Sequence, residues 1–393
     1  MKYFKDLIRL FKSKVITYTF LLIILLSAIF LRRFYKNDGL YYMLIIFVFS
    51  YFIQTLLLLK KNYAFYILRV IMVFLISIEI YALYKESIRK DVYFHEHKPI
   101  NPNGEEIISH CFMHGKDTIF NVVYVHDSLR RRIPETQEEI ENICDIKKIK
   151  HAIFLGCSFT EGEGLDYYST FPFMFEQLNP EYKSYNYGIR GSGPHDIALL
   201  FNNADIINRS AIKEKDGFAL YTFIPDHFNR VYGGSLYFLS HQIKLFHNIY
   251  IENDSIVTKK LPAWHISLVK IINNVSLLKR YLKIRLDYPH NKDFYRRFAD
   301  IVNYIAKKYW EINPQGNFYV AFYPNREYFY PYRDYNEYSE WIDYLNPEIK
   351  ILKTDLPSDL SERMGEYTIS YDGHPTKLLN EYYINKINEL IEK

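Results

Sequence analysis

Cysteine is scarce in this chain, and its few cysteines follow no recognisable pattern. The 393 residues contain three of them, Cys111, Cys144 and Cys157. A small odd number does not make a disulfide framework, and no Cys-x-x-Cys pair or zinc-like spacing is present. One bridge between Cys111 and Cys144 is conceivable if this part of the chain lies outside the cytoplasm. The sequence therefore predicts no metal site, and nothing in it calls for a cofactor.

An excess of either charge is also absent. Lys and Arg number 49 against 45 Asp and Glu, which gives a net charge of +4. Proteins that bind nucleic acid usually concentrate basic residues on one face, so this balance argues against a nucleic-acid partner. No internal repeat or low-complexity tract is visible. Most of the chain has an ordinary globular composition, and the exception is its first 84 residues, where apolar residues are crowded.

Three long apolar runs occupy residues 1–84, at about 15–31, 40–59 and 63–83. The hydrocarbon core of a bilayer is spanned by about 20 helical residues, which is close to the length of each run. The runs lack the polar stripe that helices of a soluble bundle carry. The sequence therefore predicts three transmembrane helices and the lipid bilayer as a partner.

The short loops between these runs indicate how the chain crosses the membrane. Cytoplasmic loops of membrane proteins are enriched in Lys and Arg. Placing the N-terminus inside leaves seven positive charges in the cytoplasm and three outside. Inside would be Lys2, Lys5, Arg9, Lys12, Lys14, Lys60 and Lys61, and outside Arg32, Arg33 and Lys36. Three crossings then carry the rest of the chain across the cytoplasmic membrane, so we expect an extracytoplasmic domain.

Beyond the apolar runs, residues 85–150 are polar and are expected to form a stalk and lead-in. Residues 151–393 alternate between short apolar strand candidates and amphipathic helix candidates. The strands are expected at 151–155, 185–188, 218–224, 318–323 and 349–352, and the helices at 171–178, 196–207, 294–310 and 377–392. Such alternation predicts an α/β domain whose parallel sheet is covered on both faces. The stretch 231–289 is longer than one crossover needs and is interpreted as an insertion.

The first candidate motif, residues 156–160, reads Gly-Cys-Ser-Phe-Thr and follows the first of these strands. Ligands of open α/β sheets bind at the carboxyl ends of the strands. Ser158 would stand there, and the N–H groups of the following turn could stabilise an oxyanion. The alternatives are an ordinary turn rich in Gly and Ser, and a site in which the neighbouring Cys157 is the nucleophile.

The second motif spans residues 186–194, Asn-Tyr-Gly-Ile-Arg-Gly-Ser-Gly-Pro, after the second strand. Its three glycines permit close approach of the backbone, so the loop could aim an N–H at a substrate oxygen. It lacks the Lys-Ser/Thr ending of a phosphate-binding loop. The alternative is a flexible turn that caps the next helix.

The third motif is Asp372-Gly373-His374-Pro375, just before the last helix candidate. An Asp two residues before a His on a tight turn can orient the imidazole and stabilise its charged form. The alternative is a helix-entry turn with a surface histidine. This motif supports a catalytic site mainly because of its position in the chain, since it follows a serine turn and a glycine loop.

Together these segments resemble the first, second and last sequence blocks of the SGNH (GDSL-like) hydrolase family. Residues 124–134 also look like the lead-in of a membrane-anchored bacterial branch of that family. The resemblance covers about residues 120–393. It implies a flavodoxin-like, three-layer α/β domain behind the transmembrane helices, and serine chemistry on an ester.

The resemblance also implies roles. Ser158 would attack the ester carbonyl, His374 would take the serine proton, and Asp372 would hold His374. Backbone N–H groups of Ser158 and Gly191 would form the oxyanion hole. Position 157 is Cys where the family usually has Asp. The third block, Gly-x-Asn-Asp, is missing, so His227 could replace its Asn as side-chain donor, or Asn229 could reach in.

Three functions fit these features. The first is an esterase of the bacterial cytoplasmic membrane that acts on an acyl ester, such as an O-acylated carbohydrate of the cell surface. The second is an O-acyltransferase that uses the same triad and depends on a separate membrane acyltransferase partner. The third is a non-catalytic module that binds glycan or a partner protein, which the missing third block favours and the presence of all three triad residues disfavours.

Overall fold

In the computed structural model, the described residues are 91–97, 104–135, 150–202, 212, 214, 216–234, 246–268, 289, 291–323, 340–354, 357–359 and 362–392. All of these except 261–268 belong to the unit formed by residues 90–260 and 287–393. The three expected transmembrane helices, 15–31, 40–59 and 63–83, lie outside the described residues, as does Cys144. Within the described part, no helix is both long and apolar enough to cross a bilayer.

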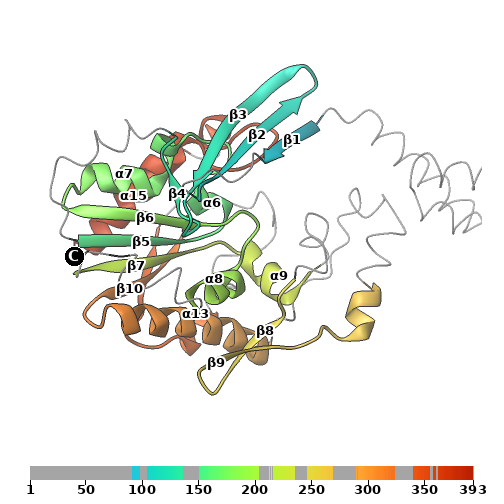
Figure 1. Ribbon diagram of the computed structural model, residues 1–393, viewed down its shortest axis with the longest axis vertical. Helices are drawn as coiled ribbons and strands as arrows, with labels where there is room; N and C mark the ends of the chain where they lie inside the picture. Colours follow the sequence, from blue (N-terminus) through green and yellow to red (C-terminus); the bar gives the residue numbers. More distant parts are fainter. Residues whose placement is uncertain are drawn as a thin grey trace, which may run out of the picture. The chain divides into compact units, whose positions relative to one another are not determined.

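The centre of the unit is a nine-stranded sheet in which five strands are parallel (Figure 1). The parallel strands are β5 (Lys150–Gly156), β6 (Tyr182–Gly188), β7 (Asp216–Phe223), β10 (Asn317–Phe322) and β11 (Lys350–Lys353). Their spatial order is β6-β5-β7-β10-β11, which is 2-1-3-4-5 in chain order and therefore the flavodoxin-like order. All five expected strands are confirmed, with boundaries shifted by three residues or fewer.

Helices cover both faces of the parallel strands, as Figure 1 shows. One face carries α7 (Phe171–Leu178) and α15 (Lys377–Ile391), and the other carries α8 (Pro194–Asn202) and α13 (Lys292–Ile312). Ala152 and Phe154 of β5 pack towards the first pair, and Ile153 and Leu155 towards the second. A strand buried on both faces reads as a continuous apolar run, which is why the sequence revealed β5 directly. The expected three-layer arrangement is thus present.

The expected stalk at residues 85–150 is not what the structure shows. Its described residues form β1 (Asp91–His97), β2 (Glu106–His114), β3 (Asp117–His126) and β4 (Arg132–Ile133). These antiparallel strands continue the central sheet, because β4 pairs with β6 through Arg132 and Asn186. The sequence of this region looks polar because two of its buried side chains, His110 on β2 and His126 on β3, are histidines. Histidines in place of apolar residues hide the pattern of a half-buried strand.

The expected insertion at 231–289 is described in part. It begins within α9 (Asp226–Tyr232) and contains a hairpin of β8 (Ile249–Glu252) and β9 (Ser255–Thr258). Ile249 of this hairpin joins the core around α13. Other short elements among the described residues include α6 (Ser158–Glu161), η1 (Tyr167–Ser169), η4 (Glu340–Tyr344) and α14 (Met364–Tyr367). The described hairpin is therefore packed onto the main domain.

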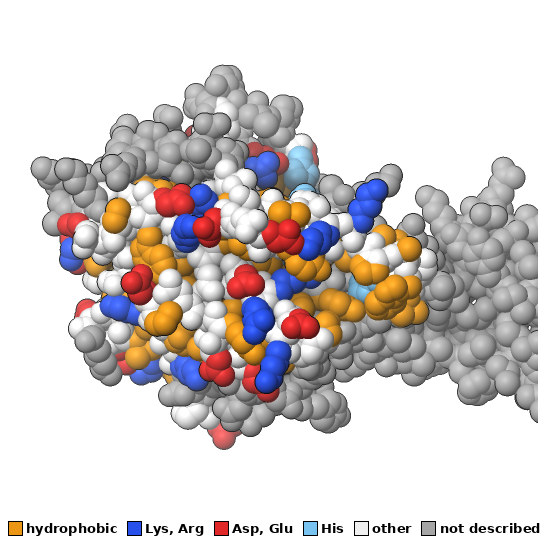
Figure 2. Space-filling view, turned by 90° about the horizontal axis from the view of Figure 1, so that it is seen from below, with side chains coloured by type: hydrophobic (Ala, Val, Ile, Leu, Met, Phe, Trp, Pro, Cys, Tyr) orange, Lys and Arg blue, Asp and Glu red, His pale blue; other side chains and the backbone are white. Residues whose placement is uncertain are grey.

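Charge is dispersed on the one face of the described residues that Figure 2 shows. Figure 2 shows the face seen from below in Figure 1, where basic and acidic side chains alternate over the described residues. This face carries no continuous basic patch of the kind that binds a nucleic-acid backbone. The even distribution agrees with the balanced composition.

Candidate active site

Ser158 lies where β5 ends and a very tight turn begins. The first turn of α6 starts at Ser158, and the amides of Thr160 and Glu161 donate to the carbonyl of Cys157 at 3.0 Å. A Cβ on Gly156 would collide with the Thr160 hydroxyl, so only glycine fits before this turn. Ser158 is thereby held at the carboxyl edge of the sheet, where the sequence analysis placed it.

The glycine loop is fastened to the same edge. After β6, the amide of Ile189 donates to the carbonyl of Gly156 at 3.1 Å, and Ser192 Oγ donates to the same carbonyl at 2.9 Å. Gly191 has a φ of 70°, in the left-handed region that favours glycine. A Cβ on Gly188 would collide with the backbone of Glu161. The second motif therefore packs directly against the turn that carries Ser158.

His374 and Asp372 come to this edge from the other end of the chain. Nε2 of His374 lies 2.8 Å from Ser158 Oγ, and Nδ1 lies 2.5 Å from Asp372 Oδ1. The backbone amide of His374 also donates to Asp372, and the Tyr93 hydroxyl donates to its second oxygen at 3.3 Å. The structure thus brings together the three residues that the motifs singled out, in the order serine, histidine and aspartate.

The charges around His374 favour its protonated form. Burial alone would lower the pKa of His374, but the carboxylates of Glu163 and Asp372 raise it to about 9. Burial would raise the pKa of Asp372, but the charge of His374 and its hydrogen bonds hold that pKa below its ordinary value. Asp372 is therefore suited to remain ionised and to stabilise an imidazolium.

Cys157, the alternative nucleophile, faces the protein interior. Its side chain is fully buried in the core with Phe154, and this burial raises the pKa of the thiol. The partly buried Arg230 is a hydrogen-bond partner of this thiol and also donates to the carbonyl of Ser192. A buried thiol with a raised pKa is a poor nucleophile, so the geometry favours Ser158 over Cys157.

His227, the candidate side-chain donor of the oxyanion hole, lies in α9 and is fully buried. Its Nδ1 lies 2.6 Å from the hydroxyl of Tyr221, while its Nε2 has no hydrogen-bond partner within the described part of the chain. Burial and the nearby Arg230 hold the pKa of His227 far below its ordinary value, so the ring is neutral. If Tyr221 donates to Nδ1, then Nε2 carries the hydrogen and is a free donor. Asn229 is also buried in this helix.

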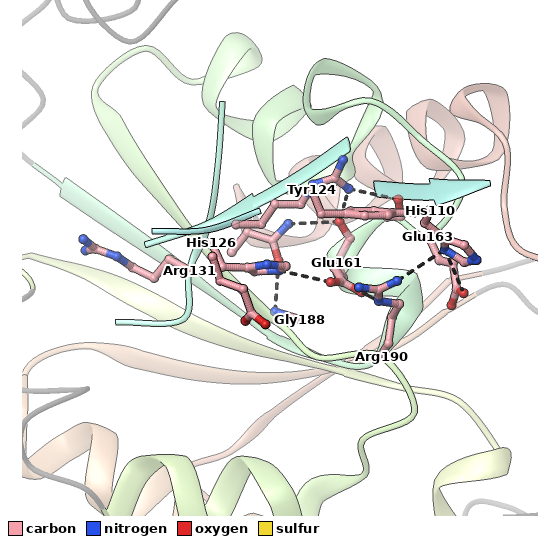
Figure 3. Close-up of polar contacts among 12 residues, drawn as sticks. His110, Tyr124, His126, Arg131, Glu161, Glu163, Gly188 and Arg190 are labelled. Atoms are coloured by element: carbon pink, nitrogen blue, oxygen red, sulfur yellow. Dashed lines mark hydrogen bonds and ion pairs between the residues drawn. The ribbon is translucent and has the colours of Figure 1, made fainter. Parts of the chain in front are cut away.

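Sequence reasoning missed a polar cluster beside the triad. Figure 3 shows Glu161 between His126 and Arg190, whose ring and guanidinium nitrogens each lie 3.1 Å from its carboxylate. The buried Arg132 donates to three backbone carbonyls, those of Glu161, Gly162 and Leu165. These contacts join the turn that carries Ser158 to β3, β4 and the glycine loop. Only the fold could reveal them, since their members are spread over 65 positions of sequence, from 126 to 190.

Glu163 is the second feature that the sequence analysis did not find. One of its carboxylate oxygens, Oε2, lies 3.1 Å from His374 Nε2, and the other lies 3.8 Å from Nδ1 of His110. His374 Nε2 therefore faces two oxygens, one from Ser158 and one from Glu163. The residue stands just past the first motif, and nothing in its spacing pointed to a histidine more than 200 positions away.

Comparison with known proteins yields structural neighbours only. No protein family model and no curated protein matches the chain. Among solved structures, a lipolytic G-D-S-L family member from Veillonella parvula is 10% identical over 62% of this chain and 99% of its own, with a TM-score of 0.35. The acetyl xylan esterase Est2A from Butyrivibrio proteoclasticus is 8% identical over 62% of this chain and 63% of its own, with a TM-score of 0.35.

A third solved structure is a family two carbohydrate esterase from Clostridium thermocellum in complex with cellohexaose. The two chains are 7% identical, and the match covers 63% of this chain and 65% of the esterase chain, with a TM-score of 0.35. At these values the likeness decides nothing about the chemistry, which has to follow from the residues of this chain.

Proposed function

We propose that this protein is a serine esterase of the SGNH type that cleaves acyl esters. The observation that carries the proposal is a chain of two hydrogen-bond contacts. Ser158 Oγ lies 2.8 Å from His374 Nε2, and His374 Nδ1 lies 2.5 Å from the carboxylate of Asp372. The three side chains come from two distant segments and meet at the strand edge where α/β sheets bind ligands. Nucleophile, base and orienting acid within hydrogen-bond reach are what acyl transfer to a serine needs.

The proposed reaction has two halves. Ser158 Oγ bonds to the ester carbonyl carbon while its proton passes to Nε2 of His374, and Asp372 stabilises the resulting imidazolium. The oxyanion receives hydrogen bonds from the backbone N–H groups of Ser158 and Gly191 and from Nε2–H of His227. The ester C–O bond then breaks, and the alcohol leaves with the proton from His374. Water repeats the sequence on the acyl-serine and releases the acid.

The substrate we propose is an O-acylated carbohydrate of the cell surface. Support comes from the apolar runs in residues 1–84 and from their loop charges, which favour a membrane-anchored protein with residues 90–393 outside the cytoplasm. Esters within reach there are those of surface glycans and lipids. Protease treatment of intact cells tests this location: cleavage within residues 90–393 is expected, and full protection would contradict it.

Transfer of the acyl group to another hydroxyl would use the same acyl-serine, with a membrane acyltransferase partner as its source. Product analysis separates the two reactions. Full-length protein is incubated with an aryl acetate or an O-acetylated oligosaccharide, with and without an added sugar acceptor. We expect free acetate, and a loss of roughly 10³-fold or more in kcat for Ser158→Ala. Equal rates for wild type and Ser158→Ala would contradict the proposal.

A further inference from the structure

Two oxygen atoms compete for one nitrogen of His374. Ser158 Oγ lies 2.8 Å and Glu163 Oε2 lies 3.1 Å from Nε2. A ring nitrogen carries either one hydrogen or one lone pair, so it serves one of these oxygens well at a time. The reaction proposed above needs that lone pair for the serine proton. Glu163 therefore stands at the position that decides when the ring can act as a base.

The place of Glu163 is fixed by the turn that holds the nucleophile. The amides of Gly162 and Glu163 donate to the carbonyl of Ser158 at 2.8 and 2.9 Å. Gly162 ends α6 in the left-handed conformation, with a φ of 86°, and a Cβ there would lie 2.5 Å from a methyl carbon of Thr170. Ser158 and Glu163 are thus presented to His374 by a single six-residue unit. The side chain of Glu163 is only 15% exposed.

Burial raises the pKa of Glu163, and among the described residues the charge of His374 is the strongest influence that lowers it. His110, on β2, lies 3.8 Å from its second oxygen, but burial and the nearby His95 and Arg190 lower the pKa of His110 to about 4, so its ring is neutral at pH 7. Arg190 also acts on Glu163, but its guanidinium is engaged by Glu161 at 3.1 Å.

The groups that face His374 show the same bias. Among the described residues they are the carboxylates of Asp372 and Glu163, the hydroxyl of Ser158 and the ring of Phe159, with Arg230 as the opposing positive charge. Two carboxylates therefore act against one cation, and they bracket both ring nitrogens. The natural state of this arrangement is an imidazolium that donates from both nitrogens.

We propose that Glu163 is a positioning residue that holds His374 as an imidazolium in the resting site and so sets the pH range in which Ser158 is activated. This inference rests on the proposed esterase function. Before Ser158 can lose its proton to Nε2, the hydrogen on that nitrogen must leave to solvent. Since Glu163 and Asp372 raise the pKa of His374 to about 9, only about 1% of the rings are neutral at pH 7. Activity should accordingly rise with pH and level off above about 9.

The test is a pH profile of kcat/KM for the full-length protein and three variants, with an aryl acetate as substrate. Glu163→Gln keeps the shape but removes the charge, and should move the midpoint down by at least one unit and raise kcat/KM at pH 7 about tenfold. Glu163→Asp keeps the charge on a shorter side chain and should retain an alkaline midpoint. Glu181→Gln changes a carboxylate just before β6 whose side chain is 42% exposed, and its profile should overlay that of the wild type. An unchanged midpoint in a folded Glu163→Gln protein overturns the inference.

A second measurement separates this inference from the proposed function. Histidine rings of the full-length protein are labelled at Cε1 and titrated by NMR, with the His374 signal assigned by its loss in His374→Gln. The ring should titrate near pH 9 in the wild type and at least one unit lower in Glu163→Gln. Identical titrations in the two proteins would refute the role of Glu163 whatever the activity. The expected shift in proteins that hydrolyse no ester would refute the esterase and leave the role of Glu163 standing.

Discussion

The contact between the glycine loop and the nucleophile turn gives the sharpest prediction about the architecture. A Cβ on Gly188 would meet the backbone nitrogen and Cα of Glu161, which cannot move aside as a flexible side chain could. Gly188→Ala must therefore push the end of β6 away from the turn α6 that begins at Ser158. Overpacking of this kind costs about 1–3 kcal/mol. A displacement of about 1 Å at Ser158 would also lower kcat/KM by roughly 10².

Gly365 provides the matched control for this substitution. It lies in the short helix α14, and a Cβ there would have nothing within 4 Å. Gly365→Ala should leave activity unchanged and alter stability by less than about 1 kcal/mol. Denaturant unfolding and esterase assays of the two full-length variants make the comparison. A Gly188→Ala protein with wild-type stability and activity would refute the proposed packing of the glycine loop on the turn of Ser158.

Three further predictions concern the triad and its support. Asp372→Asn should lower kcat by about 10³–10⁴ in a protein that still folds, and an active variant would contradict the role of this acid. Arg132→Met removes a buried guanidinium that holds three backbone carbonyls of the nucleophile turn, so unfolding should cost about 3–5 kcal/mol less. The exposed Arg296→Met should cost at most about 1 kcal/mol in the same denaturant titration, and equal losses in both would contradict this difference. Finally, the raised pKa of His374 stabilises the fold below pH 6.5, and this contribution, about 3 kcal/mol, is lost as pH rises through about 9. Unfolding at pH 6.5 and pH 9.5 should show this loss in wild type but not in His374→Gln, and a parallel loss in both would contradict it.

The parallel part of the fold followed from local pattern. Strands buried on both faces read as short apolar runs, and helices between them carry one apolar face. The five parallel strands and the helices α7, α13 and α15 were therefore found close to their true bounds, and α8 was found with a start two residues late. The motifs at Ser158, Gly191 and Asp372 lie at element ends, where chain order and fold class already restrict which segments can meet. The meeting of Ser158 with His374 was therefore a prediction that topology made plausible.

The antiparallel extension and the polar cluster could not be found in the same way. In β2 and β3, buried histidines occupy positions that a pattern search expects to be apolar, so strands were mistaken for a stalk. The role of Glu163 depends on the left-handed turn at Gly162, which places its carboxylate beside the ring of His374, 211 positions away in sequence. Local sequence gives no weight to such a contact, because it depends on how two distant loops are placed.

The most direct test of the central claim, an activated serine at position 158, is labelling of the full-length protein with a fluorophosphonate. The adduct is mapped by mass spectrometry in the wild type, in Ser158→Ala and His374→Ala, and in the control Ser255→Ala from the exposed β8–β9 hairpin. We predict an adduct on Ser158 that persists in Ser255→Ala and is lost in the two triad variants. An adduct on Cys157, or no adduct on a folded protein at pH 9, would contradict the account.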